Sequence, residues 1–246
     1  TFLGFGAINN SGTITKNGST SIRFDATSGF TQTGTITLNA GEIKFETGTI
    51  VDHTGALVFN GGTLENKGSL NYNVGSTMTG TGSFEQTAGS FNVNINHTFT
   101  TVALSITGGT TNLAGNLVVD QIFTLVNGTI TGAGSFTVNE DFTMQNGAIT
   151  GAGSLVLLKD IDWLAGTINR DLTVLSGKTA TLSTNGTKYT SADIVNNGTL
   201  DWQSGSIFIS SQPDFTNTGT FIIVGVNNTF LGFGAINNSG TITKNG

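Results

Sequence analysis

The chain contains 246 residues, of which 36 are glycine, one is proline and none is cysteine, and this composition excludes disulfide bonds and thiolate metal sites. The formal net charge of −6, with no stripe of basic residues, argues against a nucleic-acid partner. No apolar run approaches the ~20 residues that are needed to cross a bilayer, so a secretion signal or anchor is expected outside this sequence.

One short phrase, Asn-x-Gly-[Ser/Thr]-apolar, recurs along the chain. It first appears at residues 10–14 and returns at residues 66–70, 196–200 and 217–221. Asparagine and glycine tolerate the left-handed backbone of a tight corner. The alternation that follows, with threonine outward and an apolar residue inward, has the period of a half-buried strand. Each copy therefore predicts a corner followed by a strand.

Glycines recur with a period of about 20 residues and with sub-steps near a third of that length, which is the range of solenoid repeats. The longest series comprises glycines 48, 68, 89, 109, 128, 147, 166, 186, 205 and 225. Seven of the ten residues two positions later are apolar; the ten are Ile50, Leu70, Phe91, Thr111, Ile130, Ile149, Ile168, Lys188, Ile207 and Asn227. This pattern is typical of a solenoid in which one coil holds three short strands and three corners.

The strength of the pattern varies along the chain. Residues 1–18 contribute the apolar residues Phe2, Phe5, Ile8 and Ile14, and residues 19–33 give a weaker signal. Residues 34–91 are densest in inward candidates, which are Ile36, Leu38, Ile43, Phe45, Ile50, Leu57, Phe59, Leu64, Leu70, Phe84 and Phe91. Residues 127–168 are nearly regular and the phrase resumes at Asn196. No stretch holds a helical period, because glycine and threonine, both poor helix formers, interrupt every one.

The glycine series does not keep to one of the three strand faces of the coil. Between Gly48 and the equivalent position of the next repeat, it moves by about one strand face. Either a coil within 92–126 or 169–195 is irregular, or one strand face is skipped. Asparagines at corners are expected to stack in amide ladders, as in cross-β assemblies.

A longer repeat overlies the short one. Residues 1–18 and 229–246 are identical, and the numbers of equivalent positions differ by 228. We therefore expect one continuous β-solenoid over 1–246, with 1–228 as one tandem unit and 229–246 as the start of the next. An artificial duplication of one end is the alternative.

The fold class predicted is all-β, a parallel β-solenoid with about 20 residues in each coil. The glycine-[Ser/Thr]-apolar phrases resemble the right-handed β-helices of secreted adhesins, in particular filamentous-haemagglutinin-type repeats and autotransporter passenger domains. The 228-residue duplication is more similar to giant repeat adhesins and extracellular fibre proteins. This resemblance implies an elongated protein that is secreted or at the cell surface. The duplication predicts that the unit is joined to itself head to tail, as a covalent array or as stacked subunits, and the cell surface or glycans are further expected partners. The resemblance transfers no catalytic, cofactor or metal residues, so none is predicted, and the chain is not expected to be an enzyme.

A few residues are candidates for chemistry. His53 and His97 are far apart in the sequence and are expected at the solvated surface. Asp160 and Asp162 share one face of a strand beside Trp163, and acidic clusters on β-helix faces cleave polysaccharides in some enzymes. This gives the competing hypothesis, a polysaccharide-binding or polysaccharide-cleaving protein; the acidic pair Glu140 and Asp141 is a weaker version of it.

Outward Thr-x-Thr pairs and Asn-x-[Ser/Thr] triplets also recur. The threonine pairs, such as 13/15, 35/37 and 129/131, do not form one uninterrupted ladder, so a solvated strand face explains them better than ice binding. The triplets, which are glycan acceptors in organisms that glycosylate, begin at Asn9, Asn17, Asn96, Asn127, Asn185, Asn197 and Asn227.

Overall fold

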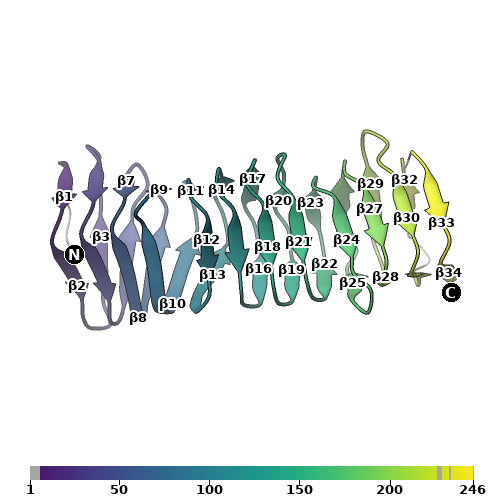
Figure 1. Ribbon diagram of the computed structural model, residues 1–246, viewed down its shortest axis with the longest axis horizontal. Coiled ribbons are helices and arrows are strands. Elements are labelled where there is room, and N and C mark those ends of the chain that lie inside the picture. The colour runs from purple at the N-terminus through teal and green to yellow at the C-terminus, as the bar shows by residue number, and fades with distance from the viewer. Residues whose placement is uncertain (1–5, 226–228, 233, 246) are drawn as a thin grey trace. The chain divides into compact units, whose positions relative to one another are not determined.

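The computed structural model describes residues 6–225, 229–232 and 234–245, and every regular element in these ranges is a β-strand (Figure 1). The predicted inward residues Phe2, Phe5 and Asn227 lie outside the described residues. The chain forms two compact units. Unit 1 comprises residues 1–121 and 128–130, and unit 2 comprises residues 122–127 and 131–246.

Unit 1 is a stack of parallel three-strand coils. The first strands of successive coils pair in the order β1 (Ile8–Asn10), β4 (Phe30–Gln32), β7 (Ile50–His53), β9 (Ser69–Tyr72), β11 (Ser90–Val93) and β14 (Thr110–Leu113). The second strands are β2 (Thr13–Lys16), β5 (Thr35–Leu38), the first halves of β8 (Ala56–Asn66) and β10 (Thr77–Gln86), then β12 (His97–Phe99) and β15 (Leu117–Val119). The third strands are β3 (Ser21–Phe24), β6 (Glu42–Phe45), the second halves of β8 and β10, and β13 (Val102–Ile106).

Unit 2 repeats the same three-strand coil. Its first strands are β20 (Ala148–Ile149), β23 (Gly166–Ile168), β26 (Lys188–Thr190), β29 (Ser206–Ile209) and β32 (Thr229–Leu231). Its second strands are β18 (Phe136–Val138), β21 (Leu155–Leu157), β24 (Leu172–Val174), β27 (Ile194–Asn196), β30 (Phe215–Asn217) and β33 (Ile236–Asn238). Its third strands are β16 (Phe123–Leu125), β19 (Phe142–Met144), β22 (Ile161–Trp163), β25 (Thr179–Leu182), β28 (Thr199–Trp202), β31 (Thr220–Ile223) and β34 (Thr241–Lys244). One further first strand, β17 (Thr129–Gly132), begins in unit 1 and ends in unit 2.

Strand register gives the coil length directly. In unit 1, Phe30 is level with Val51, Val51 with Leu70, and Leu70 with Phe91, so the residue number advances by 21, 19 and 21 in these coils. In unit 2, Ile149 is level with Ile168, an advance of 19. The prediction of a parallel β-solenoid, with three strands and about 20 residues in each coil, is confirmed.

Side chains alternate between a closed apolar interior and the surface, as the sequence pattern predicts. Ten of the eleven inward candidates between residues 34 and 91 are fully buried, with exposed fractions of 0 or 1%. Strands such as β5, with the alternating burial of Ile36 and Leu38 against Thr35 and Thr37, show the period of two. Since each interior strand pairs on both sides, its backbone groups are satisfied within the stack.

The inward assignment of Ile50 is wrong, because Ile50 is 52% exposed and its neighbour Val51 is fully buried. The preceding corner is fixed by Thr49, whose hydroxyl donates to the carbonyl of Phe24 at 3.0 Å and accepts from the amide of Ala26 at 3.2 Å. A buried threonine at the corner shifts the strand alternation by one residue. Such a shift moves every side chain of the strand to the opposite face.

The glycine series also loses register at Lys188. This residue is level with Gly166 rather than with Ile168, so the residue number advances by 22 in this coil. The extra length is taken up in the corner before β26, where Thr184 has a positive φ of 70°. This coil displaces the glycine series by two residues, which is less than the length of one strand face.

Candidate functional site

The acidic residues singled out from the sequence line a shallow depression on unit 2. Asp141, Asp160 and Asp162 surround it, together with Thr181, Ser183 and Gln203, and its volume is about 440 Å³. One oxygen of Asp160 accepts the amide of Thr179, and one oxygen of Asp162 accepts the hydroxyl of Ser183, both at 2.8 Å. These two carboxylates therefore hold neighbouring coils together.

The other residues of the competing hypothesis, Trp163 and Glu140, do not line this depression. Trp163 is 1% exposed and points into the core, away from Asp162, so it offers no aromatic surface for a sugar. Glu140 lies 4.0 Å from Lys159 instead of joining the depression. Within the described ranges, no cluster of three or more His, Cys, Asp or Glu side chains is arranged to hold a metal ion.

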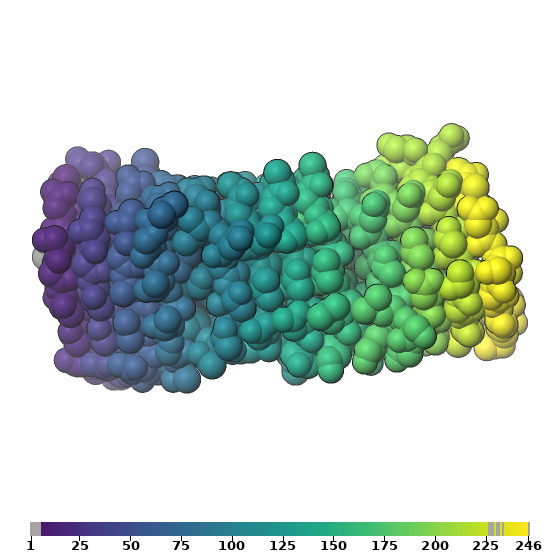
Figure 2. Space-filling view, in the orientation of Figure 1, coloured from purple at the N-terminus to yellow at the C-terminus, as the bar shows by residue number. Residues whose placement is uncertain are grey.

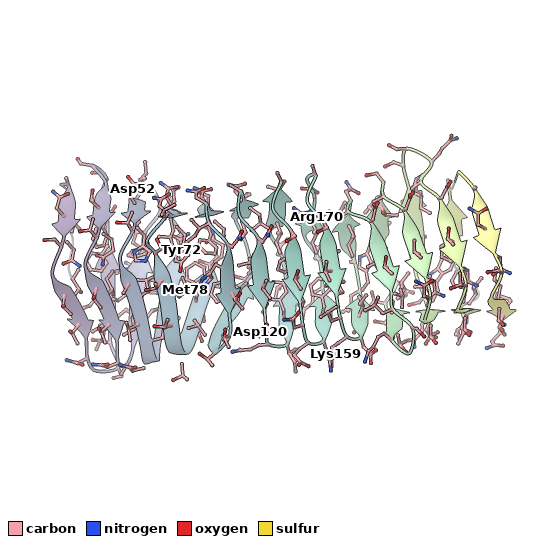
Figure 3. The ribbon with its side chains drawn as sticks, viewed as in Figure 1. Asp52, Tyr72, Met78, Asp120, Lys159 and Arg170 are labelled. Carbon is pink, nitrogen blue, oxygen red and sulfur yellow. The ribbon has the colours of Figure 1, made fainter. Side chains whose placement is uncertain are left out.

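The expectation that both histidines lie at the surface is wrong. His53 is fully buried, and its ring stacks on Tyr72 with centroids 5.7 Å apart. His97 is half-buried, and its Nδ1 lies 3.2 Å from the hydroxyl of Tyr72, which Figure 3 labels inside unit 1. Burial lowers the pKa of each histidine to about 4, although the backbone of Thr77 opposes the shift at His53. The alternation of β7 contains the missed signal, since His53 is two residues beyond buried Val51.

Three cationic side chains turn into the core, a feature that sequence reasoning missed. Lys188 is fully buried, and its Nζ donates to the carbonyls of Ser183, Thr184, Gly186 and Ser204 at 2.9–3.2 Å. Lys16 is 1% exposed and donates to the carbonyls of Asn17 and Gly18 at 3.0 and 2.6 Å. Burial lowers the pKa of Lys188 to about 8, and the charge of Asp162 works against this shift.

Arg170, which Figure 3 labels, is a buried cation of unit 2 that also donates hydrogen bonds to backbone carbonyls. It is 3% exposed, and its guanidinium group donates to the carbonyls of Gly132, Gly134, Thr150 and Ser154 at 2.8–3.3 Å. Burial also lowers the pKa of Arg170. A planar group with five donors suits several carbonyls at once. Two of its four acceptors, the carbonyls of Gly132 and Ser154, also accept the backbone amides of Gly153 and Phe136.

Amide ladders run from coil to coil, as expected. In unit 1, Asn112 donates to Asn92, Asn92 to Asn71, and Asn71 to Asp52, each at 2.7 Å. In unit 2, the side chains of Asn196, Asn217 and Asn238 form a second ladder with 2.7 Å bonds, and Asn196 and Asn217 are fully buried. The first ladder lies within β7, β9, β11 and β14, and the second lies at the ends of β27, β30 and β33, instead of at the expected corners. Repeating one residue at one position of the coil therefore links successive coils through their side chains.

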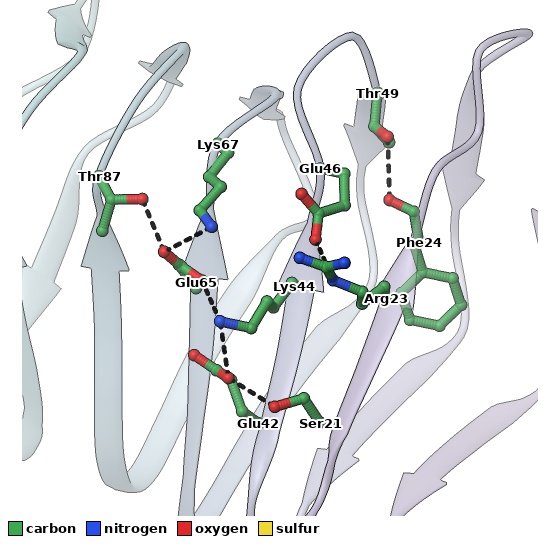
Figure 4. Close-up of polar contacts among 10 residues, drawn as sticks. All are labelled: Ser21, Arg23, Phe24, Glu42, Lys44, Glu46, Thr49, Glu65, Lys67 and Thr87. Atoms are coloured by element: carbon green, nitrogen blue, oxygen red, sulfur yellow. Dashed lines mark hydrogen bonds and ion pairs between the residues drawn. The ribbon is translucent and has the colours of Figure 1, made fainter. Parts of the chain in front are cut away.

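A network of charged side chains links neighbouring coils of unit 1 (Figure 4). Lys44 lies 2.9 Å from Glu42 and 2.6 Å from Glu65, which also receives Lys67 at 3.3 Å and the hydroxyl of Thr87 at 2.9 Å. The hydrogen bond from Lys44 to Glu65 raises the lysine pKa. Burial alone would raise the pKa of Glu65, but its hydrogen bonds from Lys44, Thr87 and Lys67 place it below the usual value. The network joins several coils through their side chains.

The last described coil of unit 2 has an open apolar end. A hollow of about 240 Å³ is lined only by apolar side chains, those of Trp202, Phe215, Phe221, Ile223, Ile236 and Ile242. Ile236 is 57% exposed and Ile242 is 45% exposed. Among the described residues, β33 and β34 each pair on one side only, with β30 and β31. Among the described residues, this end carries strand edges and apolar side chains of the kind that a further coil covers.

The duplicated sequence gives a direct comparison for this end. Ile8 and Ile14 of unit 1 correspond to Ile236 and Ile242, and they are level with Phe30 and Ile36 of the following coil. In the first copy, the next coil therefore covers the strands that the second copy leaves open. Sequence reasoning found the duplication but not the hollow, because the hollow depends on which side of each strand is covered.

Comparison with protein families, with curated proteins and with solved structures finds no match. The part of the chain that the structure describes contains no helix long and apolar enough to span a membrane.

Proposed function

We propose that this chain is a structural repeat unit of an extracellular fibre or of a long cell-surface adhesin stalk. In this proposal, 228-residue β-solenoid units follow one another end to end, and the partner of each unit is another copy of itself. The observation that carries the proposal is the identity of residues 1–18 and 229–246, which gives the open coil of unit 2 the sequence of the first coil of unit 1.

The surfaces support this role for physical reasons. Ile236 and Ile242 expose apolar area that a following coil would remove from water, at about 25 cal/mol per Å². The strand edges of β33 and β34 offer unpaired backbone groups that template a further parallel strand. Amide ladders and interior cations bind coil to coil, which suits a load-bearing stack. The role is non-catalytic and needs no cofactor or metal.

Electron microscopy of the native material tests the proposal, with filaments as the expected result. Discrete and uniform globules would contradict it. At the level of residues, Ile242→Glu places an unpaired charge in the apolar hollow and should abolish end-on association of the purified chain, measured by sedimentation velocity. Thr243→Glu on the same strand is the matched control and should leave association unchanged, since its neighbour in register, Ile222, is half-exposed.

A second candidate function is polysaccharide binding or cleavage, favoured by the depression that Asp141, Asp160 and Asp162 line. Incubation with a panel of glycans, followed by chromatography of the products, tests it. Binding or cleavage that disappears in the Asp160→Ala, Asp162→Ala double variant would support this candidate. Activity that survives the double variant would remove these residues from consideration.

A further inference from the structure

The two copies of the duplicated sequence form the same local structure. Residues 8–10 and 236–238 are the strands β1 and β33, and residues 13–16 and 241–244 are the strands β2 and β34. The corner contacts also recur: Lys16 donates to the carbonyl of Asn17 at 3.0 Å, and Lys244 donates to that of Asn245 at 3.2 Å. The strand and corner geometry is therefore a property of this sequence.

The two copies nevertheless occupy different positions within the coil. In unit 1, β1 is the first strand of its coil and is level with β4. In unit 2, β33 is the second strand of its coil, after β32, and is level with β30. The same shift places β2 second and β34 third in their coils.

Counting strands along the described chain gives the size of the shift. The long strands β8 and β10 each supply the second and third strands of a coil, since each pairs over two separate segments. From β1 to β32 the chain then completes eleven coils, and β33 is one strand further. The 228-residue repeat thus holds eleven coils and one third of another. This count explains the drift of the glycine series by one face.

We propose that, in a tandem array of these units, each unit begins one face later than the unit before it. This inference rests on the proposed end-to-end assembly. Three units complete a whole number of coils, so any surface feature returns to the same face only after three units. A feature that occurs once in each unit is then presented in three directions around the array.

The loop between β29 and β30, residues 210–214, provides a natural marker. Ser211 and Gln212 have positive φ values of 68° and 53° and are exposed, and the loop stands out from the surface of unit 2 in Figure 2. Neither residue belongs to a strand, so an insertion between them leaves the pairing of coils unchanged.

The experiment joins four 228-residue units in one chain and inserts a biotin-acceptor peptide between Ser211 and Gln212 of each. Cryo-electron microscopy of the streptavidin-labelled chain gives the direction of each label, and the twist between adjacent coils is measured in the same maps and subtracted. We expect three successive labels to differ by one third of a turn and the fourth to return to the direction of the first.

A control chain duplicates residues 149–167, which form one whole coil, in every unit. This insertion should lengthen the spacing of the labels by one strand separation, ~4.8 Å, and leave their rotation unchanged. Labels that all point in one direction along a continuous filament would overturn the one-face advance while leaving the fibre proposal intact. Joined units that form separate particles instead of one filament would overturn both.

Discussion

Interior cations are the residue-scale device that makes tight corners compatible with a closed core. A corner turns backbone carbonyls inward where no strand can pair with them, and an unpaired buried carbonyl is costly. Lys188 donates to four corner carbonyls, and Arg170 donates to four carbonyls, of which those of Gly132 and Ser154 also accept a backbone amide. Both extend the inward alternation of a strand, as Arg170 follows buried Ile168 by two residues, which the sequence alone shows. A charged side chain at an inward position is usually assigned to the surface, and this is why sequence reasoning misses them.

Replacing Arg170 tests this account. Arg170→Met keeps an unbranched apolar stem but removes the four hydrogen bonds of the guanidinium group, so we expect a loss of about 3 kcal/mol in the free energy of unfolding. Arg170→Lys keeps the charge but presents fewer donors in a less rigid arrangement and should give an intermediate loss. Denaturant unfolding of the purified chain measures both. Equal stability of Arg170→Met and the parent would show that the carbonyls find other partners.

The buried histidines predict a specific pH dependence. The folded-state pKa of His53, about 4, lies below its ordinary value of 6.5, so the unfolded chain binds more protons between these values. The contribution of His53 to the free energy of unfolding is therefore complete above pH 6.5 and is lost as the pH falls from 6.5 towards 4. Because the ring is fully buried, the difference between the two pKa values corresponds to about 3 kcal/mol in the free energy of unfolding.

Urea midpoints at pH 7.5 and pH 5.5 measure this effect, and the comparison with a variant separates it from the titration of carboxylates such as Glu85, whose pKa is raised by burial. The parent should be less stable at the lower pH. His53→Phe keeps an aromatic ring against Tyr72 and removes the titrating group, so its midpoint should change less. If the two proteins lose the same stability, protonation of His53 does not contribute to the acid sensitivity.

At the scale of elements, the two kinds of amide ladder differ in their surroundings. The ladder through Asn217 is buried, and that side chain also lies 3.1 Å from the carbonyl of Thr241. The bond from Asn94 to Asn73 belongs to an exposed corner. A buried polar group that loses its partner costs more than an exposed one, because water replaces only the exposed bond.

Alanine substitution should therefore separate the two ladders. Asn217→Ala is expected to lower the free energy of unfolding by about 2 kcal/mol or more, and Asn94→Ala by less than about 1 kcal/mol. Chemical denaturation of each single variant provides the comparison. Similar losses would indicate that ladder bonds contribute through corner geometry and not through burial.

Most of the fold follows from the sequence, because one coil is short and its pattern repeats many times. Period and alternation predict the parallel strands and nearly all inward residues of residues 34–91. The failures occur at corners. The buried hydroxyl of Thr49 fixes a corner that turns Ile50 outward. A longer corner places Lys188 level with Gly166, where the glycine series predicts Ile168. Both depend on contacts with a neighbouring coil, which the local pattern does not contain.

The candidate site is less predictable, since it belongs to the arrangement of coils. The duplication in the sequence points to assembly, but the apolar hollow beside Ile242 is visible only when the covered side of each strand is known. Asp160 and Asp162, which the sequence places on one strand face, both line one depression. Their hydrogen bonds to the next coil give them a structural task that their spacing alone does not indicate.

For the whole molecule, the stacked-coil account predicts how stability and length scale with the number of units. Each interior coil pairs with the coil on either side, so stability grows as units are joined. About eleven coils separated by ~4.8 Å give an axial advance on the order of 55 Å for each 228-residue unit. A chain of three units should therefore resist heat and denaturant far better than one unit, and fibre diffraction should show this axial repeat. A repeat far from this value, or a single unit as stable as three, would contradict the account.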